Sequence, residues 1–294
     1  MSDYPVRLDL IPEVSPFFDE VSSTFSYIVK DPDSSVCAII DSVLDFDYAA
    51  GRVSFRNADR LIAHVVEHEL ELEWIIETHV HADHLSAAPY LQERLGGRIG
   101  ISHRICEVQE TFGKIFNEGT RFQRDGSQFD ALFEDGDTWS IGTLSAFAIA
   151  TPGHTPACMA HVVGNASFCG DTLFMPDGGS ARADFPGGDA GELFDSIQKL
   201  LALPDELRMF ICHDYGPGGR DITCETTVGE QRKHNIHVGG GIEREAFVTL
   251  RTERDATLKM PGLIIPSLQV NMRAGRMPTN ETGNPQLTIP INGL

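Results

Sequence analysis

The chain has 294 residues, which is long enough to bury a sizeable core as one large domain or as a domain with an appendage. Its 43 acidic side chains outnumber 23 basic ones, giving a formal net charge of −20 at pH 7. Charge of this sign repels phosphate backbones at long range, and no run of Lys and Arg suggests a local basic groove. The composition therefore argues against a nucleic-acid-binding protein.

The N-terminal residues give no sign of a targeting segment. Residues 1–9 include Asp3 and Asp9 with one arginine, and they lack the apolar run of a signal peptide. No uninterrupted apolar stretch approaches the length of a bilayer-spanning helix. The six cysteines show no paired spacing, so we interpret them as reduced, buried side chains: Cys37, Cys106, Cys158, Cys169, Cys212 and Cys224. These features predict a cytoplasmic protein.

Two neighbouring strands are predicted near the N-terminus. The apolar runs 27–29 and 36–40 flank the turn-forming residues 31–34. Asp41 closes the second run, either as a solvated turn residue or as a brace for the polar loop further on. Asn57 predicts the cap of a helix whose apolar side chains form one stripe: Leu61, Ile62, Val65, Val66 and Leu70.

The segment 78–84 contains three imidazoles and a carboxylate, His79, His81, Asp83 and His84, directly after a strand-like run. A surface strand needs none of these, and a core would have to satisfy every buried ring nitrogen. In extended chain His79 and His81 point the same way, whereas Asp83 and His84 follow the turn and can face the same centre from another side. The cluster predicts binding of one metal ion or two. A helix is expected to open at residue 86.

Three further candidate ligands follow strand-like runs. His154 lies on a Thr-Pro-Gly-His turn after the run 144–150, where Pro and Gly re-aim the backbone. Asp171 follows residues 166–170, and His213 follows residues 209–212. In α/β architectures, rigid strands deliver side chains at such junctions into a common crevice. These residues are therefore expected to join the first cluster.

The intervening and C-terminal segments are less regular. Residues 117–137 carry several glycines and three phenylalanines, which predicts either a surface loop pinned by its aromatic rings or a wall over the active-site cleft. Helices are expected over 190–203 and around 243–258, and the tail from residue 277 shows little pattern.

The order of these motifs resembles the metallo-β-lactamase superfamily. His-x-His-x-Asp-His, Thr-Pro-Gly-His, Gly-Asp after a strand and a late His match from about residue 24 to 215. The resemblance implies an α/β fold, an αββα sandwich with the metal at one edge of two facing sheets. We expect one domain over residues 1–294, with a core over about 5–215 and a short helical and irregular C-terminal extension over about 216–294.

A narrower resemblance is to the persulfide dioxygenases, relatives of glyoxalase II, through the segments 181–185, 213–215 and 270–275. It implies one Fe²⁺ per chain, held by His79, His154 and Asp171 with open positions for dioxygen and substrate. The remaining candidates would then orient ligands and waters: His81, Asp83, His84 and His213. In the alternative, a glyoxalase II-type thioester hydrolase, these residues would help to hold a second Zn, Fe or Mn ion.

The same resemblance implies a substrate. The enzyme would oxidise glutathione persulfide with O₂ to sulfite and glutathione, with Asp184 and Asp214 near the iron but not bound to it. Because the protein is acidic, the glutathione carboxylates need nearby cations, and Arg182 or Arg273 with Tyr215 are the candidates. No nucleic-acid or membrane partner is expected, and the oligomeric state is left open, a homo-oligomer included. A non-catalytic thiol-binding module is disfavoured because it would not need the costly polar cluster.

Overall fold

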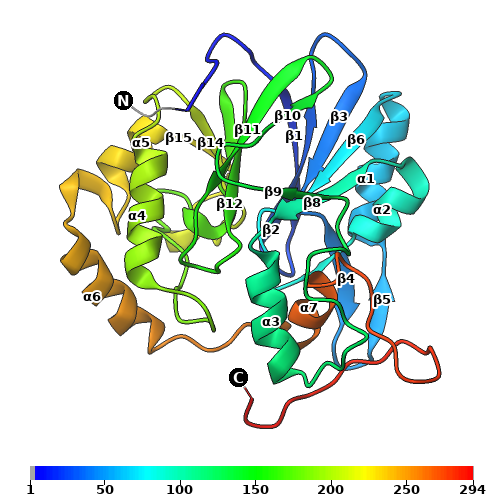
Figure 1. Ribbon diagram of the computed structural model, residues 1–294. Coiled ribbons are helices and arrows are strands. Elements are labelled where there is room, and N and C mark those ends of the chain that lie inside the picture. Colours follow the sequence, from blue (N-terminus) through cyan, green and yellow to red (C-terminus); the bar gives the residue numbers. More distant parts are fainter. Residues whose placement is uncertain (1–3, 294) are drawn as a thin grey trace.

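Residues 4–293 are described by a computed structural model, in which two six-stranded β-sheets face each other and helices cover their outer sides (Figure 1). The first sheet contains, in spatial order, β1 (Glu13–Asp19), β2 (Thr24–Lys30), β3 (Val36–Ile40), β6 (Glu71–Ile76), β8 (Arg98–Ser102) and β9 (Ala131–Phe133). Strands β1 to β3 are antiparallel, which confirms the predicted neighbouring strands, and β3, β6, β8 and β9 are parallel.

Parallel strands need crossover connections, and helices provide them here. These are α1 (Arg56–Glu67), α2 (Ala88–Leu95) and α3 (Ile105–Ile115), which pack their apolar sides on the outer face of the first sheet. A small third sheet consists of β5 (Arg52–Ser54), β4 (Val43–Asp47) and β7 (Leu85–Ser86). Because Ser86 still belongs to β7, the helix expected to open there begins two residues later, at Ala88.

The second sheet contains, in spatial order, β10 (Thr138–Ile141), β11 (Leu144–Ala150), β12 (Met159–Val163), β13 (Ala166–Phe168), β14 (Arg208–Phe210) and β15 (Glu225–Thr227). Only β13 and β14 are parallel, and α4 (Ala190–Leu201) connects them. The outer face is covered by α4 together with α5 (Val228–His234) and α6 (Arg244–Asp255). Three single-turn helices complete this half: η1 (Gly170–Thr172), η2 (Pro217–Gly219) and η3 (Gly239–Gly241).

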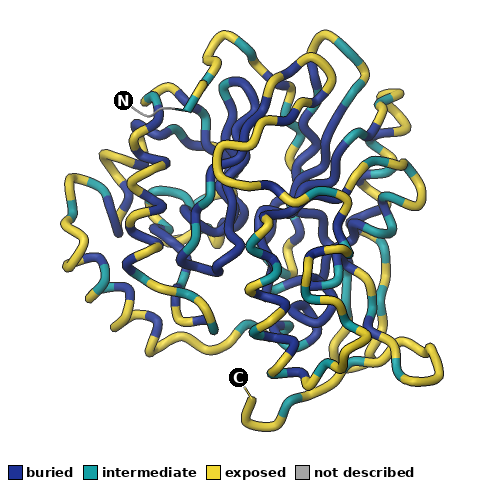
Figure 2. The backbone as a smooth tube through the Cα atoms, viewed as in Figure 1, coloured by how far each residue is buried: buried dark blue, intermediate teal, exposed yellow. Residues whose placement is uncertain are grey.

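The core between the sheets is aromatic. Tyr27 from the first sheet contacts Phe168 and Phe210 from the second, Trp74 contacts Trp139, and all five are buried. Figure 2 shows that burial follows the central strands, while the outward sides of the helices are exposed. Central strands that are apolar on both faces suit a sheet enclosed by helices on one side and a second sheet on the other. This rigid frame sets the positions of the loops at one edge, where the polar motifs lie.

Helix α1 differs from its prediction in two details. Asn57 does not cap it, because the helix begins at Arg56 with Phe55 at the N-cap, and Asp45 of β4 accepts from the backbone N–H of Asn57 at 3.0 Å. Instead the Asn57 side chain donates to Asp19 at 3.0 Å and to Asp45 at 2.8 Å. Val66, assigned to the apolar stripe, is 64% exposed. The polar groups offered by β1 and β4 have therefore overridden the capping preference of asparagine.

The segment 117–137 is a surface excursion that contains the short strand β9. Phe129 and Phe133 are buried and pin it to the first sheet. None of its residues lines the pocket beside the candidate metal ligands, so the pinned surface loop is the better description of the two.

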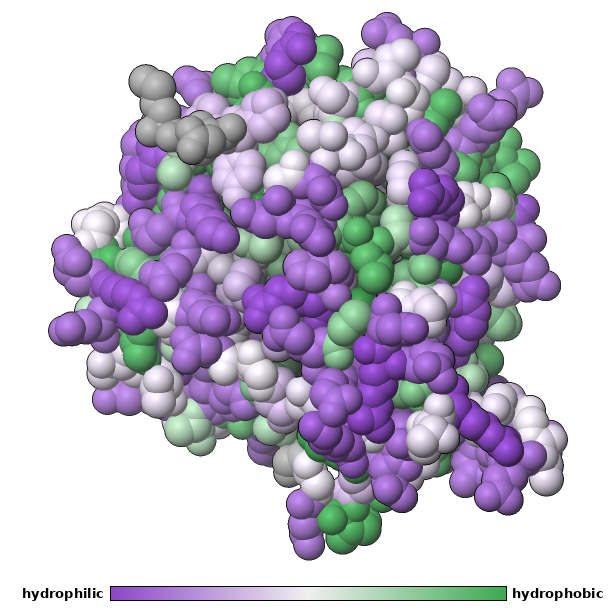
Figure 3. Space-filling view, in the orientation of Figure 1, coloured by the Kyte–Doolittle hydropathy of each residue, from purple (hydrophilic) through white to green (hydrophobic). Residues whose placement is uncertain are grey.

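The C-terminal extension has two parts with different positions. Helix α6 packs beside α4 on the second half, whereas α7 (Ile264–Asn271) packs on β7 in the first (Figure 1). Among residues 4–293, no helix combines the length and the apolar character that crossing a bilayer requires. The face in Figure 3 is mostly hydrophilic, with small, separate apolar areas.

Candidate metal centre

The loop after β6 is held by Asp41, which follows β3. The backbone N–H and the hydroxyl of Thr78 both donate to the Asp41 carboxylate at 2.8 Å. The same carboxylate lies 3.0 Å from His81 Nε2, so the other ring nitrogen of His81, Nδ1, points away from Asp41. Burial alone would raise the pKa of Asp41, but the neighbouring His81 holds that pKa at about 2. Asp41 is therefore a brace for the loop and not a solvated turn residue.

The same loop is also held by Asn271, at the end of α7. Its amide nitrogen donates to the carbonyl oxygens of His81 at 2.9 Å and His84 at 2.8 Å, and its amide oxygen accepts from the Ser86 backbone at 2.8 Å. Asn271 is 5% exposed, so all three bonds lie out of water. They fix the backbone on both sides of the turn that carries Asp83.

His79, His154 and Asp171 come together as the sequence predicts. Asp171 Oδ2 lies 3.8 Å from His79 Nε2 and 3.6 Å from His154 Nε2. The other ring nitrogen of His154 donates to the Arg182 carbonyl oxygen at 2.7 Å, which directs Nε2 towards Asp171. All three side chains are buried, and their ligand atoms lie within 4.8 Å of one another. Two imidazoles and one carboxylate thus face a common centre.

Two glycines allow the segments to approach so closely. Gly170, before Asp171, has φ +53°, and a Cβ there would lie 2.6 Å from the Thr78 hydroxyl. Gly153, before His154, has φ +132°, and a Cβ would lie 2.2 Å from the backbone nitrogen of Leu193. Both positions need the left-handed side of φ space and have no room for a side chain.

A second cluster adjoins the first. His81, Asp83 and His84 offer ligand atoms within 4.8 Å of one another. His213 lies between the clusters, with Nε2 3.2 Å from Asp171 Oδ1 and 3.6 Å from Asp83 Oδ2. Burial lowers the pKa of His213, but the carboxylates of Asp171 and Asp83 outweigh it and raise that pKa to about 9. The structure thus brings all seven predicted ligand candidates to one place.

Unpaired nitrogens in both clusters fit bound metal. In the described part of the chain, His79 Nε2, His81 Nδ1 and His84 Nε2 are buried without a hydrogen-bond partner. Buried polar atoms are nearly always paired, so three orphans facing carboxylates need an explanation. Imidazole and carboxylate together suit iron, zinc or manganese. The site is therefore a metal-binding site by its donor set.

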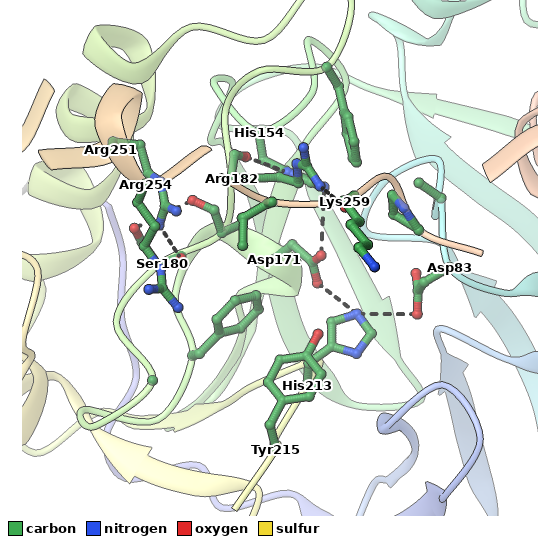
Figure 4. A pocket seen from close by; sticks show the side chains of 17 residues that line it. Asp83, His154, Asp171, Ser180, Arg182, His213, Tyr215, Arg251, Arg254 and Lys259 are labelled. Carbon is green, nitrogen blue, oxygen red and sulfur yellow. Dashed lines mark hydrogen bonds and ion pairs between the residues drawn. The ribbon is translucent and has the colours of Figure 1, made fainter. Parts of the chain in front are cut away.

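A pocket of about 300 Å³ opens onto these residues and is lined by Asp83, His154, Asp171 and His213 at its base (Figure 4). Figure 4 shows Asp171 between His154 and His213, with Tyr215 at the rim. The Tyr215 side chain is 62% exposed, and its ring stacks on His213 with centroids 6.0 Å apart. The opposite wall comes from α6 and the residues after it, which supply Arg251, Arg254, Leu258, Lys259 and Pro261.

Arg182 also lines this pocket, but its guanidinium group is already engaged. It binds both oxygens of Asp184, at 2.6 and 2.7 Å, and donates to the Lys259 carbonyl oxygen at 2.7 Å. The ring of Phe185 lies 4.8 Å below it. Arg182 and Asp184 thus fix the shape of the segment whose carbonyl group holds His154.

Asp214 is held by an arginine that sequence reasoning missed. Arg220 makes paired bonds to Asp214, at 2.7 and 2.8 Å, and to Asp177, at 2.8 and 3.0 Å. It ties the loop after Asp171 to the loop after His213. Arg220 stands in a polar, glycine-rich stretch with no pattern that sets it apart.

Arg273 lies outside this pocket. Its guanidinium group contacts Glu118 at 2.6 Å, donates to the Gln269 carbonyl oxygen and covers the ring of Phe122 at 4.2 Å. It lines a separate surface pocket with residues 118–122 and 278–281. The structure therefore does not bring Arg273 together with the other predicted site residues.

Comparisons with known proteins agree with this geometry. The family described as "Metallo-beta-lactamase superfamily" matches residues 19–213. A "Probable metallo-hydrolase" of Burkholderia pseudomallei is 52% identical over 96% of this chain and 99% of its own. The human mitochondrial "Persulfide dioxygenase ETHE1" is 30% identical over 88% of this chain and 87% of its own. The crystal structure of ETHE1 from Myxococcus xanthus superposes with a TM-score of 0.72 at 29% identity, covering 90% of this chain and all of that one.

Proposed function

The chain belongs to the metallo-beta-lactamase superfamily, and on that premise we propose that it is a persulfide dioxygenase. The proposed reaction converts glutathione persulfide, O₂ and one water into glutathione, sulfite and two protons. The supporting observation is the contact between His154 and the segment 181–185. That segment resembles persulfide dioxygenases, and its Arg182 carbonyl group directs the His154 ring into the triad. The sequence similarity to a protein named persulfide dioxygenase adds to this support.

Each proposed residue has a defined task. His79, His154 and Asp171 would hold one ferrous ion on one side, leaving open positions towards the pocket. The iron supplies the redox chemistry for dioxygen and the persulfide sulfur. His213 and Asp83 lie beside the open side and would exchange protons with the substrate, while Asp41 and Asn271 keep the loop of His79 in place.

Arg254 and Lys259 are better candidates than Arg273 for the glutathione carboxylates. Four arginine and lysine side chains line the pocket, but Arg182 is paired with Asp184 and Arg251 with Asp255. Arg254 and Lys259 are exposed, and neither side chain takes part in an ion pair found among residues 4–293. In Figure 4, Lys259 lies over the space between Asp171 and Asp83. Two free cations beside the metal ligands suit a thiol that carries two carboxylates.

The test is metal analysis of anaerobically purified protein together with an oxygen-electrode assay on glutathione persulfide. We expect about one iron per chain and one sulfite formed for each O₂ consumed. The variant His154→Ala should lose both iron and turnover, since a triad cannot spare one of its members. Two zinc ions per chain without oxygen uptake would overturn the proposal.

A binuclear thioester hydrolase is the second candidate. The cluster of His81, Asp83 and His84 favours it, because these residues with His213 could hold a second ion beside the first. The similarity to a probable metallo-hydrolase points the same way. Hydrolysis of S-lactoylglutathione by the two-zinc form, at a rate that exceeds persulfide oxidation by the iron form, would establish this alternative.

A further inference from the structure

A buried ion pair on α6 stands outside the metal cluster and outside the proposed reaction. Arg251 and Asp255 are one helical turn apart, and their side chains are 2% and 4% exposed. Arg251 Nη2 lies 2.7 Å from Asp255 Oδ1, and Arg251 Nε donates to the same oxygen at 2.9 Å. Charged groups are rarely buried this deeply, because leaving water costs each of them several kcal/mol in rough terms. The same two charged residues on the exposed face of α6 would not have had to leave water.

The pair binds one short backbone segment at two points. Arg251 Nη1 donates to the Ser180 carbonyl oxygen at 3.0 Å. Asp255 Oδ2 accepts from the Ala183 N–H at 2.8 Å. Arg251 and Asp255 thus bind the two ends of the segment 180–183. Without them, the buried Ser180 carbonyl group and the buried Ala183 N–H would lose these hydrogen-bond partners.

Between these two points lies the carbonyl group that orients a metal ligand. The Arg182 oxygen accepts from His154 Nδ1 at 2.7 Å, and His154 Nε2 faces Asp171. Hydrogen bonds to the outer nitrogen of a ligating histidine fix its tautomer and the direction of its ring. A continuous chain of contacts therefore runs from α6 through the segment 180–183 to His154.

We propose that Arg251 and Asp255 are positioning residues for the metal ligand His154, acting through the Arg182 carbonyl group. The helix that forms the pocket wall thereby also sets the direction of one ligand at the pocket base. The inference concerns metal binding alone, so it holds for either chemistry considered for this site. Failure of the proposed dioxygenase reaction would leave it standing.

The test is an anaerobic titration of metal-free protein with Co²⁺, whose visible absorption reports the geometry of its ligands. The double variant Arg251→Met with Asp255→Leu removes both charges together, so no unpaired buried charge remains to unfold the protein. It also withdraws the partners of Ser180 and Ala183. We expect the Co²⁺ affinity to fall roughly tenfold to a hundredfold, the usual effect of losing support behind a ligand, and the absorption bands to change shape.

An exposed ion pair between the same helix and α4 serves as the control. Arg244 binds Asp195 of α4 at 3.1 Å, and both side chains are more than half exposed. The double variant Arg244→Met with Asp195→Leu should keep the wild-type Co²⁺ affinity and spectrum. The milder variant Arg251→Lys keeps a positive charge beside Asp255 but cannot make the forked contact to both Asp255 and the Ser180 carbonyl oxygen, so it is expected to fold with a smaller loss of affinity. If the double variant and the milder variant both fold and keep the wild-type Co²⁺ affinity and spectrum, the proposal is overturned. Lower melting temperatures alone would then leave the pair a purely structural role.

Discussion

The side-chain amide of Asn271 donates to the backbone carbonyl oxygen of His84 at 2.8 Å, across a separation of 187 residues in sequence. The end of the chain's last helix thus closes the loop that carries four of the seven ligand candidates. Helix α7, which packs on the small third sheet, therefore supports the metal site.

Replacing Asn271 should therefore damage both stability and metal binding. Asn271→Ala removes three buried hydrogen bonds and leaves the His81 and His84 carbonyls without this donor. We expect unfolding to become easier by about 2–5 kcal/mol and metal affinity to fall. Chemical denaturation of the metal-free and metal-loaded protein measures both effects. Equal stability loss with and without metal would show that the residue does not support the metal loop.

Arg220 should control the order of the pocket rim. Lysine cannot make two paired contacts at once, so Arg220→Lys frees either Asp177 or Asp214. The loop with Tyr215 should loosen, and KM should rise more than kcat falls. Steady-state kinetics and limited proteolysis check this, with the exposed Arg232→Lys as a control. Protection of the loop equal to wild type would contradict it.

The two free cations of the pocket should govern substrate affinity. Arg254→Gln and Lys259→Gln should each weaken binding by about 1–2 kcal/mol, less than a fully buried charged hydrogen bond because both side chains are exposed. The readout is KM for glutathione persulfide, with kcat nearly unchanged. Arg273→Ala is the matched control and should lower the melting temperature without changing KM. The reverse pattern would restore Arg273 as the anchor.

His161 should make the fold sensitive to acid. It is 0% exposed on β12, both ring nitrogens lack partners among the described residues, and burial lowers its pKa to about 4. An unfolded histidine titrates near pH 6.5, so the unfolded state binds more protons between pH 6.5 and 4. The stability linked to this group is present above pH 6.5 and is lost as the pH falls. The loss amounts to about 3 kcal/mol at pH 4.

The variant His161→Leu tests this. Urea unfolding at pH 7.5 should show equal or greater stability than wild type, because an unpaired buried polar ring is replaced by an apolar one. The advantage of the variant should grow as pH falls from 6.5 to 4. His234, which is exposed, provides the control substitution His234→Leu, and a parallel pH dependence for His161→Leu and wild type would rule out the effect.

The two ligand clusters should respond differently to substitution if one iron is bound. His84→Ala should reduce activity by roughly tenfold to a hundredfold while iron stays bound, since His84 then only orients its neighbours. His213→Ala should behave likewise. Iron content measured beside turnover decides the matter: loss of one of two bound metal ions in either variant would place these residues among the ligands.

The ligand candidates and the sandwich could be predicted because they depend on short motifs at strand ends. His79, His154 and Asp171 each follow a run whose apolar character already defines a strand, so the strand delivers the side chain. The sandwich itself was predicted through the resemblance to the metallo-β-lactamase superfamily, which the order of the motifs carries. Local sequence supplied the strands and the ligand candidates.

The supporting residues depend on tertiary contacts that local sequence does not encode. Arg220, Arg251 and Asp255 find partners 43 to 72 residues away. Arg273 shows a related difficulty. Asn271 is the last residue of α7 and faces the metal loop, whereas Arg273 lies in the turn that follows the helix and faces Glu118. A motif identifies a neighbourhood, but the point at which the helix ends and the chain turns decides which member reaches the site.

The three ligands of the proposed iron come from both halves of the sandwich. His79 follows a strand of the first sheet, whereas His154 and Asp171 follow strands of the second. A bound ion is therefore a further cross-link between the two sheets, which are also joined by side-chain packing and by the backbone hydrogen bond from Phe25 of β2 to the Cys212 carbonyl oxygen after β14. By mass action, free metal at a hundred times its dissociation constant would add about 2.7 kcal/mol to the free energy of unfolding. Metal supply would then set how long the folded chain persists, as well as how fast it works.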